Sequence, residues 1–113
     1  MTDRMQIGPA EGIWVVRADG AVIAESRNAL ELRETGHDRV IYFPRADVAM
    51  AFVEASPTRT HCPHKGDASY FHIAASNGRI ADAAWCYDAP VASAQQIGGH
   101  LAFDAAKVTV ERL

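Results

Sequence analysis

Apolar residues in this chain come mostly in short runs separated by turn residues, and this pattern predicts a mainly β fold. The predicted strands cover residues 13–17, 21–26, 39–43, 67–75, 79–87, 100–103 and 107–112. Asp19-Gly20 lies between the first two and favours a type I′ hairpin. Residues 46–55 fit either a strand or a helix, because apolar and polar residues alternate there although alanine is frequent. A short helix is predicted at residues 91–97, which follow Pro90 and precede Gly98-Gly99.

A second predicted hairpin allows a more specific inference about side-chain direction. A two-residue turn at Asn77-Gly78 would pair Ser76 with Arg79 and set Tyr70 opposite Trp85. Alternation would then place Tyr70, His72, Trp85 and Tyr87 on one face and Phe71, Ile73, Ala84 and Cys86 on the other. The first set has apolar bodies with polar tips, which suits either the wall of a binding site or a packed cross-strand pair in the core.

Composition narrows the function classes. The 113 residues suit one domain, which we expect over residues 11–113 with residues 1–10 as an N-terminal tail. The formal net charge of −3 and the scattered Lys and Arg residues argue against a nucleic-acid-binding surface. No apolar stretch approaches the length of about 18 residues that crosses a bilayer, and the first residues lack a signal-peptide core, so we expect a cytoplasmic protein without membrane partners.

The chain has two cysteines, Cys62 and Cys86, which we expect to be free thiols. A metal site that combines them with His61 and His64 is conceivable, but no CxxC pair supports it. We therefore predict neither a metal ion nor a cofactor.

The richest segment chemically is residues 60–70, Thr-His-Cys-Pro-His-Lys-Gly-Asp-Ala-Ser-Tyr, where a proline and a glycine shape a bend. Cys62 could be a nucleophile or redox thiol if a cation such as Lys65 stabilised its thiolate, or it could be a small buried apolar residue. The ammonium of Lys65 and the open backbone of Gly66 could receive an anion. The predicted ligand-binding residues are Arg45, Lys65, Gly66, Tyr70, Trp85 and Tyr87, and the predicted catalytic residues, if the protein is an enzyme, are Cys62 and Lys65.

Several segments in order carry a family likeness: residues 26–30, 42–48, 60–70, 82–87 and 97–103. Together they resemble domain-of-unknown-function family 427, which is sometimes labelled a nucleotidyltransferase-type domain, over about residues 11–111. The resemblance implies a β-tent fold, in which two antiparallel sheets pack at an angle with one or two short helices. Relatives in that fold group often bind zinc through paired CxxC motifs, which this chain lacks.

The chain departs from the family pattern at two positions. His64 stands where most members resemble Cys-Pro-Tyr-Lys-Gly, and Cys86 stands where members usually resemble Trp-Ser-Tyr. Neither residue is therefore expected to carry chemistry shared by the family. The Gly-Ser pair and spaced aspartates of nucleotidyltransferases are also absent, so the motifs do not support that label.

Three hypotheses follow from these residues. The first is a domain that binds an unidentified small molecule, anionic or flat, at the residue 62–66 loop and the face of Tyr70, Trp85 and Tyr87. The second is an enzyme that uses Cys62, or a nucleotidyltransferase-type activity as the family label suggests. The third is a protein-interaction module, which would show an exposed apolar patch and no enclosed pocket.

Overall fold

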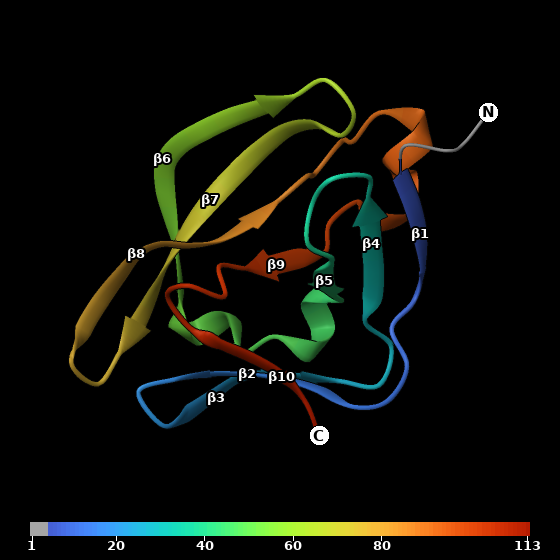
Figure 1. The fold of residues 1–113 in the computed structure, drawn as a ribbon. Helices are drawn as coiled ribbons and strands as arrows, with labels where there is room; N and C mark the ends of the chain where they lie inside the picture. The colour runs from blue at the N-terminus through green and yellow to red at the C-terminus, as the bar shows by residue number, and fades with distance from the viewer. Residues whose placement is uncertain (1–4) are drawn as a thin grey trace.

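Two antiparallel sheets make up the computed structural model, which describes residues 5–113 (Figure 1). The strands are β1 Met5–Pro9, β2 Trp14–Ala18, β3 Ala21–Ser26, β4 Leu30–Glu34, β5 Val40–Phe43, β6 Val53–Cys62, β7 Gly66–Ala75, β8 Gly78–Cys86, β9 Leu101–Phe103 and β10 Thr109–Arg112. The larger sheet has the order β1-β4-β5-β9-β8-β7-β6, and the smaller has the order β10-β2-β3. The smaller sheet runs across β4 and β5 of the larger (Figure 1). The predicted mainly β fold with two antiparallel sheets is confirmed.

The helices of residues 5–113 are short 3₁₀ turns: η1 Arg45–Asp47, η2 Met50–Phe52 and η3 Ala92–Ile97. The helix predicted after Pro90 corresponds to η3. The ambiguous segment 46–55 divides between η1, η2 and the start of β6, which explains why neither pattern dominated it. Within the described residues, no helix is long and apolar enough to cross a membrane.

The prediction of an N-terminal tail over residues 1–10 is wrong where the structure describes it, and residues 1–4 lie outside the described part. Met5–Pro9 form β1, which pairs antiparallel with β4, a strand that the sequence analysis also missed. The reason is tertiary packing: Met5 and Ile7 lie against an apolar cluster of the large sheet. Both side chains are only partly buried, so this five-residue segment forms a strand because β4 offers an edge with which it can pair.

The first predicted hairpin forms as expected. Asp19 and Gly20 both adopt positive φ, +49° and +81°, which is the backbone conformation that a type I′ turn requires. They connect β2 to β3, whose register shifts by one residue after Val16.

The second predicted hairpin is wrong at its turn and right at its centre. Ala75 pairs with Gly78, so the turn residues are Ser76-Asn77 rather than Asn77-Gly78. A bulge then inserts two extra residues into β8 between Ile80 and Ala84, where Asp82 has a φ of +48°. Two inserted residues preserve the alternation of side chains and also offset the earlier turn, so Tyr70 lies opposite Trp85 as predicted.

The large sheet has an apolar cluster on each face. The larger cluster lies between the two sheets and includes Trp14, Val16, Ile23, Ile41, Phe43, Ile73, Ala84, Cys86, Leu101 and Phe103. The smaller cluster lies on the other face and includes Leu32, Tyr42, Ala68, Tyr87, Ala94, Ile97 and Ala102, with Tyr70, Trp85 and Cys62 packed against it. The predicted separation of Tyr70, Trp85 and Tyr87 from Phe71, Ile73, Ala84 and Cys86 is therefore confirmed.

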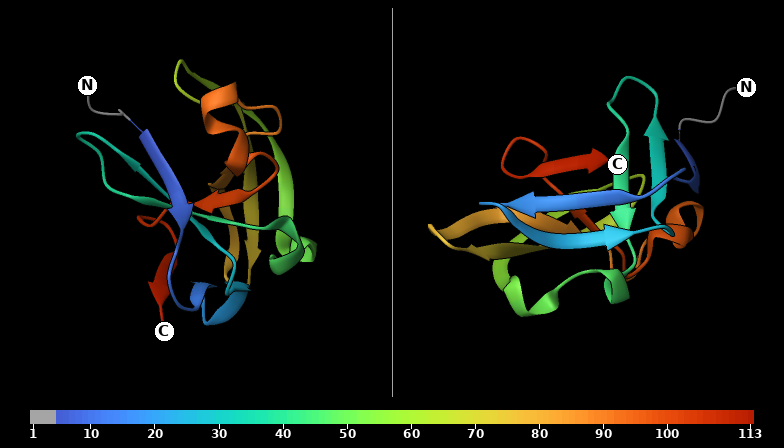
Figure 2. Two further views of the ribbon diagram at one scale, coloured as in Figure 1. Left: turned by 90° about the vertical axis from the view of Figure 1, so that its right-hand side faces the viewer. Right: turned by 90° about the horizontal axis from the view of Figure 1, so that it is seen from below.

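The large sheet is strongly bent, so that β1 and β4 at one end lie across from β6 and β7 at the other (Figure 2). Residues that are far apart in strand order consequently meet: Lys65, in the β6–β7 loop, forms an ion pair with Glu34 at the end of β4. This bend positions the candidate site described next.

Candidate functional site

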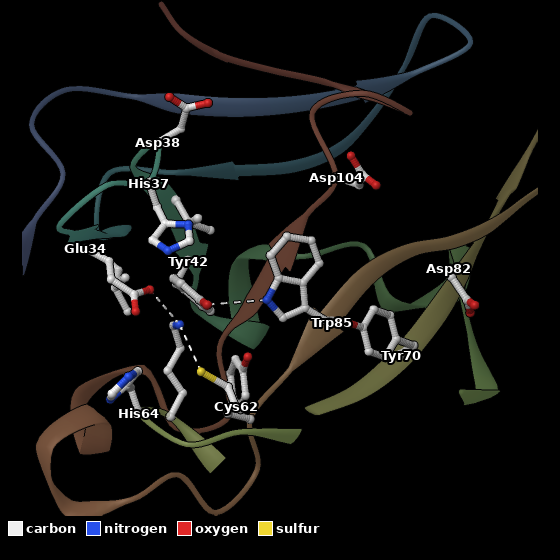
Figure 3. A pocket seen from close by; sticks show the side chains of 14 residues that line it. Glu34, His37, Asp38, Tyr42, Cys62, His64, Tyr70, Asp82, Trp85 and Asp104 are labelled. Carbon is white, nitrogen blue, oxygen red and sulfur yellow. Dashed lines mark hydrogen bonds and ion pairs between the residues drawn. The ribbon is translucent and has the colours of Figure 1, made fainter. Parts of the chain in front are cut away.

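A cavity of about 640 Å³ lies between the two ends of the bent sheet, on the face that carries Tyr70 and Trp85 (Figure 3). Its lining comes from β4, β5, β8 and the β6–β7 hairpin, together with the segments that connect them. The lining residues are Leu32, Glu34, His37, Asp38, Val40, Tyr42, Cys62, His64, Lys65, Tyr70, Asp82, Trp85, Tyr87 and Asp104. Its volume falls in the range of small-molecule sites.

Lys65 connects the carboxylate of Glu34 with the thiol of Cys62, and Figure 3 labels these two partners. Its Nζ donates to Glu34 Oε1 at 2.9 Å and to Cys62 Sγ at 3.4 Å. The side chains of Lys65 and Glu34 are only 12% and 10% exposed. The ion pair is therefore largely withdrawn from water and links the two ends of the sheet.

The two charged groups stabilise each other. Burial alone would lower the pKa of Lys65, but its contacts with Glu34 and Cys62 outweigh burial and raise that pKa above the ordinary lysine value. The hydrogen bond from Lys65 in turn holds the pKa of Glu34 below its usual range. Both groups stay ionised near neutral pH, so Lys65 acts as a fixed cation and not as a nucleophile or a base.

The β6–β7 hairpin holds Lys65 in place through its backbone. Cys62 pairs with Gly66, and the Lys65 N–H donates to the Cys62 carbonyl at 3.1 Å. The Lys65 carbonyl accepts a hydrogen bond of 2.9 Å from the Val91 N–H, which ties the loop to the segment before η3. The separation of Cys62 and Lys65 is thus set by a short, closed loop.

Gly66 has a different role from the one predicted. Its φ is +119°, and a Cβ at this position would lie 3.4 Å from Pro90 Cα and 3.5 Å from Ala89 O. The residue is buried against the segment before η3 and does not belong to the cavity lining. Glycine suits this position because a φ of +119° is strained for a residue with a side chain, whereas the contacts of an added Cβ would be ordinary.

Aromatic side chains form the long wall of the cavity. The rings of Tyr70 and Trp85 have centroids 6.4 Å apart and are tilted by 37°. The Trp85 indole N–H donates to the Tyr42 hydroxyl at 3.3 Å, and the Tyr70 hydroxyl lies 3.0 Å from Thr60 Oγ1. Tyr87 also lines the cavity but is largely buried, and burial raises its pKa. The structure therefore brings Tyr70, Trp85 and Tyr87 together with Cys62 and Lys65 around one cavity.

Arg45 does not join the cavity. It lies beside the other face of the large sheet, with Nη2 3.7 Å from Cys86 Sγ and 3.7 Å from Asp88 Oδ1. Its guanidinium also lies 6.0 Å from the centre of the Phe71 ring. The predicted role of Arg45 in the same ligand site is wrong, because Arg45 follows β5 on the side of the larger cluster.

Cys86 and Cys62 occupy opposite faces of the large sheet. Burial, followed by the neighbouring Asp88 carboxylate, raises the pKa of the Cys86 thiol to about 11. Among residues 5–113, no three His, Cys, Asp or Glu side chains are grouped so that they could hold a metal ion.

Sequence reasoning missed the residues that β4 and the neighbouring segments supply, above all Glu34, His37, Asp38, Tyr42 and Asp104. The alternation of Leu30 and Leu32 with charged residues could have indicated β4. No sequence signal connected Glu34 with Lys65, because they lie 31 positions apart.

Asp82 also lines the cavity and was missed. Both of its carboxylate oxygens accept hydrogen bonds from β6, Oδ1 from Ser56 at 2.5 Å and Oδ2 from Thr58 at 2.8 Å. These bonds lower the pKa of Asp82 and stabilise its positive φ at the β8 bulge.

Comparison with known proteins identifies the family. A sequence model of a domain of unknown function, DUF427, matches residues 6–113. The chain therefore belongs to this family, and the resemblance inferred from its motifs is confirmed. A search of the curated proteins found no match.

Proposed function

We propose that this member of the DUF427 family binds a flat small molecule in the cavity between the two ends of its bent sheet. The observation that carries the proposal is the meeting of Tyr42, Tyr70 and Trp85 around one hollow of about 640 Å³. Trp85 and Tyr70 remain partly exposed there, although both have apolar bodies that would otherwise favour burial. A concave aromatic cavity of this volume favours a ligand-binding domain over a protein-interaction module.

The lining favours a flat ligand more than the anionic one expected from the sequence. Of the lysines and arginines in residues 5–113, Lys65 alone lines the cavity, and its charge is already paired with Glu34. Carboxylates at Asp38, Asp82 and Asp104 surround the remaining volume. A second anion would enter a field that is already negative.

Ligand screening tests this proposal. Flat heteroaromatic fragments should raise the unfolding temperature of the wild-type protein, since a ligand at 100 times its dissociation constant stabilises by about 2.7 kcal/mol. Trp85→Leu should abolish the shift because it removes the stacking surface. Phe52→Leu is the matched control, because Phe52 is a large exposed apolar residue outside the cavity. Hits that bind both variants equally would place the ligand elsewhere and refute the proposal.

The contact between Lys65 Nζ and Cys62 Sγ favours a second candidate, an enzyme in which Cys62 reacts with the bound molecule. In this candidate the ammonium stabilises the thiolate, and the aromatic wall orients the substrate. Its test is the rate of alkylation of Cys62 against pH in a Cys86→Ser background, repeated with Lys65→Gln. Identical profiles with and without the Lys65 ammonium would remove the enzyme candidate and leave the binding site.

We also propose that the protein works in a reducing compartment such as the cytoplasm. The two cysteines of the chain are both free, and one of them lines the proposed site. A thiol in this position keeps its properties only where disulfides do not form readily. Localisation of a tagged full-length protein in its native cell tests this assignment, and recovery from an oxidising compartment would contradict it.

A further inference from the structure

We infer that the ligand of the proposed binding site is a small organic cation, an amine carried on a flat ring. This inference rests on the proposed function. The inference combines the charge around the cavity with the direction in which its aromatic rings are available. The inference deepens the proposed function, because the carboxylates and the aromatic rings are those of the proposed site.

The charge around the cavity is negative after the internal ion pair is counted. Among residues 5–113, the charged groups of the lining are the carboxylates of Glu34, Asp38, Asp82 and Asp104 and the ammonium of Lys65, and the lining also contains two histidines, His37 and His64. Lys107 and His72 stand close by outside the lining. Lys107 donates to Ala81 O at 2.9 Å, and His72 Nδ1 lies 3.6 Å from Asp82 Oδ1. The four carboxylates outnumber the two ammonium groups of Lys65 and Lys107, so an excess of negative charge remains.

The aromatic rings are available to a ligand through their faces. The Trp85 N–H is already satisfied by the Tyr42 hydroxyl, and the Tyr70 hydroxyl is already paired with Thr60. What these partly exposed side chains still offer is the electron-rich ring surface, which attracts cations. A ring face beside carboxylates is the combination that recognises an organic ammonium group.

The same chain shows this contact elsewhere. The guanidinium of Arg39 lies over the ring of Trp14, 5.2 Å from its centre. At that position the cation comes from the protein itself. Within residues 5–113, no Lys or Arg side chain lies over the Trp85 ring, so a ligand can supply the cation there.

Three matched probes isolate the effect of ligand charge: 2-phenylethylamine, 2-phenylethanol and phenylacetate. They share a phenyl ring and are cationic, neutral and anionic at about pH 8, where histidines are largely neutral. Calorimetric titration and ligand-observed NMR should show that the amine binds at least about tenfold more tightly than phenylacetate, since each unpaired carboxylate several Å away contributes about threefold. This preference should shrink at high salt, because Asp38, at the rim of the cavity, is exposed to solvent.

Variants locate the effect. Asp38→Asn removes one rim carboxylate and should weaken amine binding by about threefold without changing the binding of the alcohol. Glu25→Gln is the matched control, because Glu25 is an exposed carboxylate on β3 of the smaller sheet. Trp85→Leu should weaken the binding of both the amine and the alcohol.

The outcomes separate the two proposals. Phenylacetate binding as tightly as the amine, with both lost in Trp85→Leu, would overturn the cation inference and retain the binding site. An unchanged amine affinity in Asp38→Asn would overturn the assignment of charge to this rim. If no probe binds at ~10 mM, which excludes even millimolar affinity, both the ligand class and the proposed site are wrong.

Discussion

Two groups in this protein contain the same three kinds of side chain, a thiol, a cation and a carboxylate, on opposite faces of one sheet. The first is Cys62 with Lys65 and Glu34, and the second is Cys86 with Arg45 and Asp88. The sulfur lies 3.4 Å from the ammonium nitrogen in the first and 3.7 Å from the guanidinium nitrogen in the second. From composition alone the two groups would be judged equivalent.

Burial is distributed in opposite ways in the two groups. In the first, the charged pair is buried, at 12% and 10% exposure, while the thiol is partly exposed to the cavity. In the second, Arg45 and Asp88 are 44% and 65% exposed, while the thiol is fully buried. The first arrangement therefore offers a thiol to a ligand beside a fixed cation. In the second arrangement, a solvated ion pair covers a buried sulfur, so Cys86 contributes to packing and is not available to a ligand.

The largest expected difference is in thiol reactivity. In the folded protein at about pH 8, iodoacetamide should label Cys62 at least ~100-fold faster than Cys86. Cys86 is buried, and its pKa of about 11 leaves only about one thiolate in a thousand at that pH. Mass spectrometry of peptides after timed labelling measures both rates, with Cys62→Ser and Cys86→Ser to assign them. Comparable labelling rates at the two positions would contradict the conclusion that Cys62 is accessible and Cys86 is not.

The next difference is in stability. Lys65→Met leaves the Glu34 carboxylate buried without a partner and should reduce the free energy of unfolding by ~2–3 kcal/mol, somewhat less than for a fully buried pair. Arg45→Met breaks an exposed pair and should cost less than ~1 kcal/mol. Urea denaturation of both variants measures the contrast.

A double variant provides the control for this prediction. Lys65→Met combined with Glu34→Leu removes both charges and should recover much of the lost stability, because an apolar pair of similar size needs no partner charge. A double variant that is as unstable as Lys65→Met would mean that packing of the lysine stem, and not the stranded carboxylate, explains the loss.

The smallest expected effect is in the pH dependence of stability. The pKa of Glu34 is held below its ordinary value by the Lys65 hydrogen bond, so its contribution is complete above about pH 4.5 and is lost as the pH falls through the lowered value. Wild-type protein and Glu34→Gln should therefore differ in unfolding free energy at pH 6 and converge towards pH 3. Asp88→Asn, at an exposed position, should change little at either pH. A constant difference between wild type and Glu34→Gln across this range would show that Glu34 does not act through its charge.

The β7–β8 hairpin shows which structural features the local sequence pattern can predict. Its strands, its faces and the pairing of Tyr70 with Trp85 followed from alternation, yet its turn was placed one residue too late. The predicted pairing is recovered at the centre because the two extra residues of the bulge at Asp82 offset a turn that lies one residue earlier than predicted. That bulge depends on Ser56 and Thr58 of β6, and no pattern within the hairpin indicates them.

By itself, the sequence determined the mainly β class, most strand positions, the type I′ turn at Asp19-Gly20 and the aromatic face of β7 and β8. These features depend on neighbouring residues, on turn conformation and on the two-residue period of a strand. Only the tertiary structure decided that Glu34 meets Lys65, that Arg45 lies on the other face, and that residues 5–9 join the sheet. Those outcomes depend on how a seven-stranded sheet bends and on which edges remain free to pair, and both are properties of contacts between distant segments.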